Sequence, residues 1–276
     1  MNRLWLGLGS VLALIAIGAY FWLRQTPPQL PPPVPVVPPA AVAPPPAIVP
    51  AKPAIDYPLP LPPGTAELPP LEQSDDFIRE RMAELFSAQT IETHFLIENF
   101  VRRAVATVDN LGRSFAPPSK WPLRQTPGRF SVATGADGSV IGANNAARYG
   151  AFVALVEAVD TERAAALYRR LYPLFQRAYE DLGYPGKYFN DRLVAVIDLL
   201  LETPEPSGAL KVELPEIRGP LQPTRPWVLY RYSDPALEGL SSGQKILLRA
   251  GRENEKRLKA KLAGFRKQIA GDKASR

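Results

Sequence analysis

The chain has 276 residues, no cysteine and a single histidine, His94, with a formal net charge of +6. The missing cysteines exclude disulfides, thiolate nucleophiles and cysteine-ligated metals. One imidazole also excludes any site that needs two histidines from one chain. The charge is uneven, because residues 241–276 hold 11 basic and three acidic side chains. The basic character therefore belongs to the C-terminal segment and not to the whole chain.

An uncharged apolar run, Leu4–Leu23, lies near the N-terminus. As a helix it would span about 30 Å, the thickness of the hydrocarbon core of a bilayer. The run exceeds the apolar region of a cleaved signal peptide, which is the rival interpretation. Residues 1–25 are therefore predicted to form a cytoplasmic end and a transmembrane anchor, with the lipid bilayer as partner.

The basic groups around this run suggest its orientation. Arg3 and the α-amino group lie before it, and only Arg24 follows before Lys52. Positive charge is retained on the cytoplasmic side of membranes, so the N-terminus is expected inside. We therefore expect a single-pass protein of the inner membrane with a periplasmic C-terminal domain.

Proline dominates the next segment, since residues 27–70 contain 19 prolines. Each proline fixes φ and removes a backbone donor, so neither helix nor sheet is expected. Residues 26–70 are predicted to be a disordered or polyproline II linker that acts as a semi-rigid spacer. A role as ligand for a proline-binding partner is the open alternative.

Residues 71–276 are predicted to form a mainly helical soluble domain of about six helices with one or two short β-hairpins. Apolar residues recur at helical spacing in six stretches. These stretches are about 75–86, 90–111, 144–156, 161–182, 191–201 and 241–270. Polar residues at their starts are the expected N-caps. The caps are Ser74 to Asp76, Thr90, Asn144 or Asn145, Asp160, Asn190 and Ser241.

Short strands are expected between these helices. Two apolar runs flank Gly-Ala-Asp-Gly at 135–138, which predicts a hairpin over 129–141. Residues 210–214 and 227–232 are two further possible strands. The proline-containing stretch 114–127 is predicted to be a loop.

The helix predicted over 161–182 carries an aromatic stripe of Tyr168, Tyr172, Phe175 and Tyr179, at spacings of four, three and four. Aromatic side chains of this kind usually pack in a core, and stacking on sugar rings is the alternative. Pro173 is expected to kink the helix. The adjacent pair Arg169–Arg170 is expected to face solvent or an acidic partner.

Long motifs in this domain resemble a known family. They are LPPLEQSD at 68–75, RRAVATVDNL at 102–111, LYRRLYPLFQRAYEDLGYP at 167–185, FNDRLVAVIDLLLETP at 189–204, YSDPALEGLSSGQKILLRAG at 232–251 and NEKRLKAKL at 254–262. Together they resemble the bacterial domain-of-unknown-function family 3014. The resemblance implies a membrane-anchored envelope protein without an assigned activity, and it supplies no catalytic residue.

Catalytic candidates are few. His94 is the only imidazole base, but a catalytic triad is defined by geometry and not by the presence of a histidine. Glu98, Asp109, Asp191 and Asp198 lie among apolar residues. Two of them, Asp191 and Asp198, would share a helix face about 10 Å apart, a separation compatible with a glycosidase.

The alternative for these carboxylates is structural. Capping or ion pairing would engage Asp109 and Asp191, with Arg102, Arg103 or Arg192 as partners. No Walker loop, dinucleotide-binding turn or EF-hand loop occurs. No catalytic residue, cofactor or metal is therefore assigned.

The basic C-terminal helix is the strongest interaction signal. Its candidate partner-binding residues are Lys256, Arg257, Lys259, Lys261, Arg266 and Lys267. An envelope protein or anionic polymer is the expected partner, and a solvated helix face is the alternative. Nucleic acid is not expected outside the cytoplasm. The favoured function is a non-enzymatic scaffold or adaptor; a peptidoglycan-directed glycosidase and an energy-coupling protein with a proline rod are the alternatives.

Overall fold

The computed structural model describes residues 54–60, 68–136, 138–216 and 223–270. The predicted anchor at Leu4–Leu23 and most of the predicted linker lie outside the described residues. Within the described ranges, no helix is both long and apolar enough to cross a membrane.

The described part of the chain is mainly helical, as predicted, with nine α-helices and four short strands. The elements in chain order are η2 (Leu71–Gln73), α2 (Asp75–Met82), α3 (Ala88–His94), α4 (Phe100–Leu111), η3 (Pro118–Lys120), β1 (Val132–Gly135), β2 (Gly138–Ile141), η4 (Ala143–Tyr149), α5 (Gly150–Ala158), α6 (Thr161–Asp181), α7 (Phe189–Leu201), β3 (Lys211–Glu213), η5 (Pro226–Val228), β4 (Arg231–Tyr232), α8 (Pro235–Glu238), α9 (Ser242–Ala250) and α10 (Arg252–Ile269).

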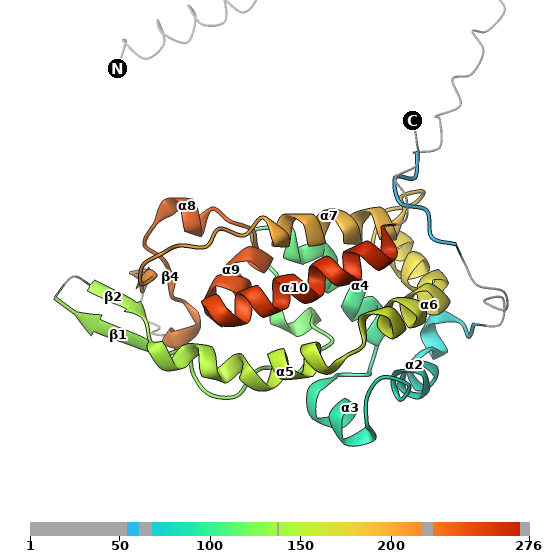
Figure 1. Cartoon of the computed structure of the whole chain (residues 1–276), viewed down its shortest axis with the longest axis horizontal. Helices are drawn as coiled ribbons and strands as arrows, with labels where there is room; N and C mark the ends of the chain where they lie inside the picture. Colours follow the sequence, from blue (N-terminus) through green and yellow to red (C-terminus); the bar gives the residue numbers. More distant parts are fainter. Residues whose placement is uncertain (1–53, 61–67, 137, 217–222, 271–276) are drawn as a thin grey trace, which may run out of the picture. The chain divides into compact units, whose positions relative to one another are not determined.

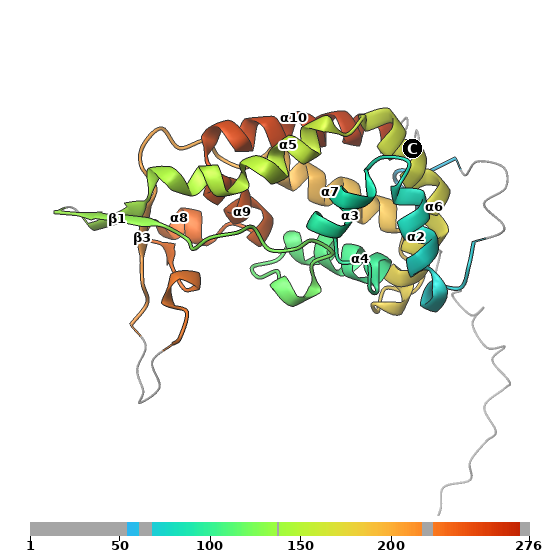
Figure 2. The same cartoon turned by 90° about the horizontal axis from the view of Figure 1, so that it is seen from below.

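The helices pack in layers. α4 and α10 lie on opposite sides of α7 (Figure 1, Figure 2). α10 contacts α5, α6 and α7, and α4 contacts α6, α7 and α9. The main core lies between these helices and includes Ile78, Val101, Val105, Leu171, Phe189, Val194, Ile197 and Ile269. The apolar residues that recur at helical spacing in the sequence are thus the residues through which these helices pack together.

The predicted number of helices, about six, is too low because two predicted helices are each divided in two. The stretch 90–111 forms α3 and α4, separated by an extended Phe95 and by Asn99 at φ 55°. Phe95 forms a β-bridge with Leu123: its own N–H still donates to Ile91 O, but Leu96 N donates to Pro122 O and His94 O accepts from Arg124 N, so the chain leaves the helix there. Asp75 then caps α4 by accepting from Asn99 N at 2.7 Å and Phe100 N at 3.2 Å.

The C-terminal stretch 241–270 is likewise divided, into α9 and α10. The break is at Gly251, whose φ of 91° ends the helix. Ser241 caps α9 as predicted, in a capping box with Gln244. The short α8 is a further helix beyond the predicted set, and its N-cap Asp234 accepts from Ala236 N at 2.8 Å.

The predicted hairpin, the predicted strand 210–214 and the last two residues of the stretch 227–232 join one antiparallel sheet, in the order β1-β2-β3-β4. The start of the stretch 227–232 is not a strand, because Pro226–Val228 forms the 3-10 helix η5. Val132 pairs with Ile141, Val140 with Lys211, and Val212 with Tyr232. The sheet lies at one end of the helices (Figure 1). The prediction of one or two short hairpins did not include the pairing of β3 with β2, because η4 and three α-helices separate these strands and such pairing leaves no local sequence signal.

The aromatic stripe of α6 is part of the core, as predicted. Tyr168, Tyr172 and Tyr179 are buried, and Phe175 packs against them. Burial raises the pKa of Tyr168 and of Tyr172, so both phenols stay protonated in the folded chain. The stripe is therefore used for packing and is covered by its neighbours.

Substitution of Gly251 by alanine is expected to lower the free energy of unfolding by about 2 kcal/mol or more. Its φ is unfavourable for an L side chain, and a Cβ there would lie 2.7 Å from Ala146 Cβ. Thermal or urea unfolding of the Gly251→Ala variant measures this loss.

The matched control is Gly264→Ala on α10. Its Cβ would lie 3.6 Å from the nearest atom, on Thr161, and alanine favours helix by up to about 1 kcal/mol. Equal stability of the two variants would contradict the claim that the backbone conformation of Gly251 is needed for the break between α9 and α10.

Candidate functional site

The basic residues predicted to bind a partner line α10, but most of them contact the chain itself. Arg257 forms two bonds to the carboxylate of Glu157 on α5. Arg266 does the same with Asp198 on α7. Lys261 Nζ donates to Val159 O at 2.7 Å. These contacts fasten α10 to its neighbours. Arg257 and Arg266 are paired with carboxylates, whereas Lys261 donates to a neutral carbonyl.

Lys259 is the most enclosed member of this set, with 13% of its side chain exposed. Its Nζ lies 2.6 Å from Thr203 O, 2.9 Å from Glu255 Oε1 and 3.3 Å from Glu205 Oε1. The lysine therefore joins α10 to the chain that follows α7, and its reversal to glutamate would disrupt that junction.

The two remaining members are more open. Lys256 lies 3.6 Å from Glu253 on an exposed face. Lys267 is exposed and makes no ion pair within the described part of the chain. Five of the six predicted residues thus have an intramolecular partner, and whether any of them also meets another molecule stays a prediction.

The predicted carboxylates are also engaged. Both oxygens of Asp191 accept backbone N–H groups, from Asp56 at 3.1 Å and Tyr57 at 2.8 Å. Asp198 is occupied by Arg266. Neither carboxylate is placed to protonate or attack a bound sugar while it holds these partners.

His94 and Glu98 are separate from that pair. His94 is the last residue of α3 and is half-buried, and its carbonyl accepts from Arg124 N. Glu98 is exposed on the turn before α4, where its carbonyl accepts from Arg103 Nε at 2.8 Å. The predicted catalytic candidates are therefore not gathered into one site.

Asp109 forms a buried charge cluster between α4 and α7. Its side chain is 6% exposed and accepts from Arg192 Nε at 3.0 Å, Arg113 Nη2 at 2.7 Å and Tyr184 Oη at 3.1 Å. The carboxylate raises the pKa of Arg113, chiefly through its charge. The predicted structural use of Asp109, with Arg192 as partner, is thus confirmed.

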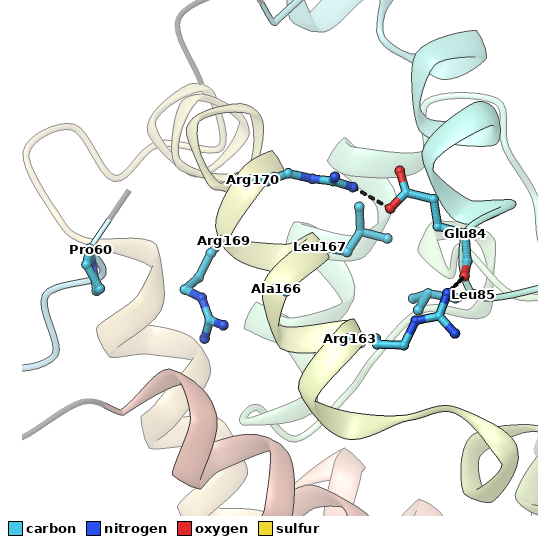
Figure 3. Close-up of a pocket in the computed structure, with 8 residues that line it drawn as sticks. All are labelled: Pro60, Glu84, Leu85, Arg163, Ala166, Leu167, Arg169 and Arg170. Carbon is cyan, nitrogen blue, oxygen red and sulfur yellow. Dashed lines mark hydrogen bonds and ion pairs between the residues drawn. The ribbon is translucent and has the colours of Figure 1, made fainter. Parts of the chain in front are cut away.

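A pocket of about 430 Å³ opens beside α6 and is lined by three arginines (Figure 3). Its lining residues are Pro60, Glu84, Leu85, Arg163, Ala166, Leu167, Arg169 and Arg170. Most of the lining comes from one face of α6, because residues three, four and seven positions apart share a side of a helix. Three guanidinium groups and one carboxylate, that of Glu84, therefore line the pocket, and only Arg170 contacts that carboxylate.

The hydrogen bonds of these arginines neutralise only part of their positive charge. Arg170 donates to Glu84 Oε2 at 2.6 Å, and the other oxygen of Glu84 accepts from Arg81 at 3.1 Å. Arg163 donates to the backbone carbonyl of Glu84 at 2.5 Å. Arg169 donates to the carbonyl of Gln268, near the end of α10, at 3.0 Å.

Two of the three pocket arginines are thus held by neutral carbonyls and have no carboxylate partner within the described ranges. A guanidinium has five N–H donors, so Arg163 and Arg169 each keep donors for a ligand. Leu85, Ala166 and Leu167 give the pocket an apolar part. The arrangement suits an anionic group attached to a less polar body.

The sequence indicates only two of the residues that line this pocket. Arg169 and Arg170 are expected from the sequence to face solvent or an acidic partner, whereas Arg163, two turns earlier, is not singled out. Glu84 and Pro60 reach the pocket only through the tertiary fold. No cluster of three metal-binding side chains occurs among the residues that the structure describes.

Comparison with known proteins gives one match. Residues 100–266 match the model of a family described as protein of unknown function (DUF3014), which confirms the resemblance seen in the sequence. No curated protein and no solved structure matches the chain. The family's description names no activity or ligand.

Substitution of Asp109 by alanine is expected to destabilise the fold by about 2–4 kcal/mol, because it leaves Arg192 and Tyr184 without their shared acceptor. Asp181→Ala is the matched control, since Asp181 pairs with Arg102 and Arg177 near the surface and should cost under about 1 kcal/mol. Chemical unfolding of both variants measures the difference. Similar losses of unfolding free energy in the two variants would show that the buried cluster around Asp109 stabilises the fold no more than a surface ion pair does.

Proposed function

Because this chain belongs to the DUF3014 family, whose description assigns no activity, we propose its function from the geometry of the helical domain. The protein is a non-enzymatic scaffold or adaptor that binds an anionic partner outside the inner membrane. The partner's acidic or phosphate groups bind in the α6 pocket, through Arg163 and Arg169. This proposal shifts the contact from α10, where the basic residues mostly serve the fold, to α6.

The observation that carries the proposal is the charge imbalance in the pocket. Three guanidinium groups line it with one carboxylate, Glu84, and that carboxylate is shared with Arg81 outside the lining. Guanidinium groups without a carboxylate partner give the pocket a positive potential, which an anion would neutralise. A binding function explains why the fold tolerates this arrangement.

The chemistry of the ligand follows from the side chains. Arginine forms paired, charge-assisted hydrogen bonds with carboxylate and phosphate, and does so more specifically than lysine. The leucines and alanine beside it add an apolar contact. Acidic side chains on a protein face and the repeating anions of an envelope polymer both offer such groups.

The predicted anchor and linker complete the proposal. An apolar run at Leu4–Leu23 would hold the protein in the inner membrane, and a proline-rich spacer would carry the domain to a partner at a distance. Such a tether raises the local concentration of the domain near the membrane, which is how an adaptor gains effective affinity.

A peptidoglycan-directed glycosidase remains the alternative proposal. It requires a proton on one carboxylate and a free second one, and Asp191 and Asp198 are instead bonded to backbone amides and to Arg266. Release of fragments from peptidoglycan by the purified chain, lost in Asp191→Asn and Asp198→Asn, would favour this alternative. The energy-coupling hypothesis has no supporting contact within the described residues.

The test of the adaptor function compares two charge-matched double variants of the full chain. Arg163→Gln with Arg169→Gln removes two positive charges from the pocket, and Lys256→Gln with Lys267→Gln removes two from exposed positions on α10. The probes are inorganic polyphosphate and poly-L-glutamate, with binding measured by calorimetry at physiological ionic strength.

The pocket variant should bind at least one probe about tenfold more weakly or worse, because each charge-assisted bond is worth roughly 1.5–3 kcal/mol. The α10 variant should change by less than about threefold, the size of a general charge effect. Equal losses in the two variants, or undiminished binding by the pocket variant, would contradict the proposal.

A further inference from the structure

Residues 54–60 lie against the start of α7 and the end of α10, although they come from the proline-rich part of the sequence (Figure 1). Asp191 accepts from Asp56 N at 3.1 Å and from Tyr57 N at 2.8 Å. The phenol oxygen of Tyr188 accepts from Leu59 N at 3.0 Å. Three backbone donors of a short segment are therefore bound by two neighbouring side chains.

The acceptors match the pattern of prolines in the segment. Its sequence is Ala-Ile-Asp-Tyr-Pro-Leu-Pro, and Pro58 and Pro60 have no N–H to donate. The side chains of Asp191 and Tyr188 meet N–H groups at positions 56, 57 and 59 and pass over Pro58. A shift by one residue would place a proline opposite an acceptor, so the contacts select one register.

A buried amide completes the contact. Asn190 is fully buried, and its Nδ2 donates to Tyr57 O and to Ile269 O, each at 2.9 Å. Its Oδ1 accepts from Tyr168 Oη at 3.2 Å. The amide is held by α6 and α10 independently of the segment, so one donor is positioned in advance for a peptide carbonyl.

Two side chains of the segment, those of Tyr57 and Leu59, also pack against the domain. Leu59 is 8% exposed and belongs to the main core cluster. The guanidinium carbon of Arg266 lies 5.9 Å from the centre of the Tyr57 ring, and Asp198 holds that arginine in position. Leucine and tyrosine at these two positions therefore add selectivity to the backbone contacts.

We propose that Tyr188, Asn190, Asp191 and Arg266 form a binding groove for an extended, proline-flanked peptide, and that residues 54–60 are its ligand in cis. No backbone–backbone hydrogen bond joins this segment to another described residue, so no sheet or helix ladder holds it. Extended proline-rich peptides are recognised in grooves lined by aromatic side chains, and Tyr188 supplies such a side chain here.

The cis arrangement has a consequence for both sites. A segment on the same chain has an effective concentration in the millimolar range, so it outcompetes a free peptide of equal affinity. Pro60, at the end of the segment, also lines the arginine pocket. Exchange of the segment for a partner peptide removes one wall of that pocket and frees the end of the tether.

The experiment vacates the groove without altering it. In the full chain, Asp56→Pro, Tyr57→Pro and Leu59→Pro together remove all three backbone donors. The probe is a fluorescein-labelled synthetic peptide of sequence AIDYPLP, and fluorescence anisotropy measures binding. The triple variant should bind the probe saturably and at least about tenfold more tightly than the wild-type chain, whose groove is filled.

A control peptide with proline in place of tyrosine lacks one donor to Asp191. It should bind the triple variant at least about tenfold more weakly, since a hydrogen bond to a charged group is lost. Absence of saturable binding by a folded triple variant would overturn the proposal, as would equal binding of the two peptides.

Hydrogen exchange of the wild-type chain decides the matter if circular dichroism shows that the triple variant does not fold. Backbone amides of residues 54–60 should exchange at least about tenfold faster than those in the middle of α7, because a ligand in cis leaves the groove without global unfolding. Exchange of the two segments at the same rate would show that residues 54–60 are an inseparable part of the domain.

Discussion

The buried amide of Asn190 is the contact on which the arrangement of the domain depends. It joins α7, where it resides, to Tyr168 on α6, to the last turn of α10 and to the segment at Tyr57. A buried amide without partners would cost several kcal/mol, so α6, α7 and α10 must meet in one geometry to satisfy it. That geometry in turn brings Pro60 and the end of α10 to the edge of the arginine pocket.

Charge on this domain has two distinct uses. On α10, Arg257 and Arg266 are paired with carboxylates on the adjoining helices, Glu157 and Asp198. In the α6 pocket three arginines lie with one carboxylate, that of Glu84, and Arg163 and Arg169 donate to carbonyls that carry no net charge. A run of basic residues in a sequence therefore says less about binding than the number of acceptors that the fold supplies.

Local features of the fold were accessible from the sequence. The caps at Asp160 and Ser241 and the hairpin after residue 129 follow from short-range patterns, and so does the core position of the aromatic stripe. The break at Gly251 and the left-handed Asn99 were missed, because apolar residues at helical spacing occur on both sides of each of them. Contacts between distant segments were also missed: Asp75 caps α4 instead of its own helix, and Asn190 binds other elements instead of capping α7.

The candidate site shows the same limit. Arg169 and Arg170 could be recognised as open cations from their place beside the aromatic stripe, but the pocket needs Glu84 from the turn after α2 and Pro60 from the linker. The sequence does not distinguish the enclosed lysines of α10 from the exposed ones, since Lys259 and Lys267 both lie in the same basic stretch. Only their surroundings differ: one is enclosed between two glutamates and the other is exposed.

The most direct measurement follows the arginine side chains during binding. In the full chain labelled with ¹⁵N arginine, the Nε–H signals report each guanidinium separately while inorganic polyphosphate is added. The account predicts that the signals of Arg163 and Arg169 shift first and saturate, while those of Arg257 and Arg266 stay in place. Shifts confined to the α10 arginines, or equal shifts of all four, would contradict a binding site on α6.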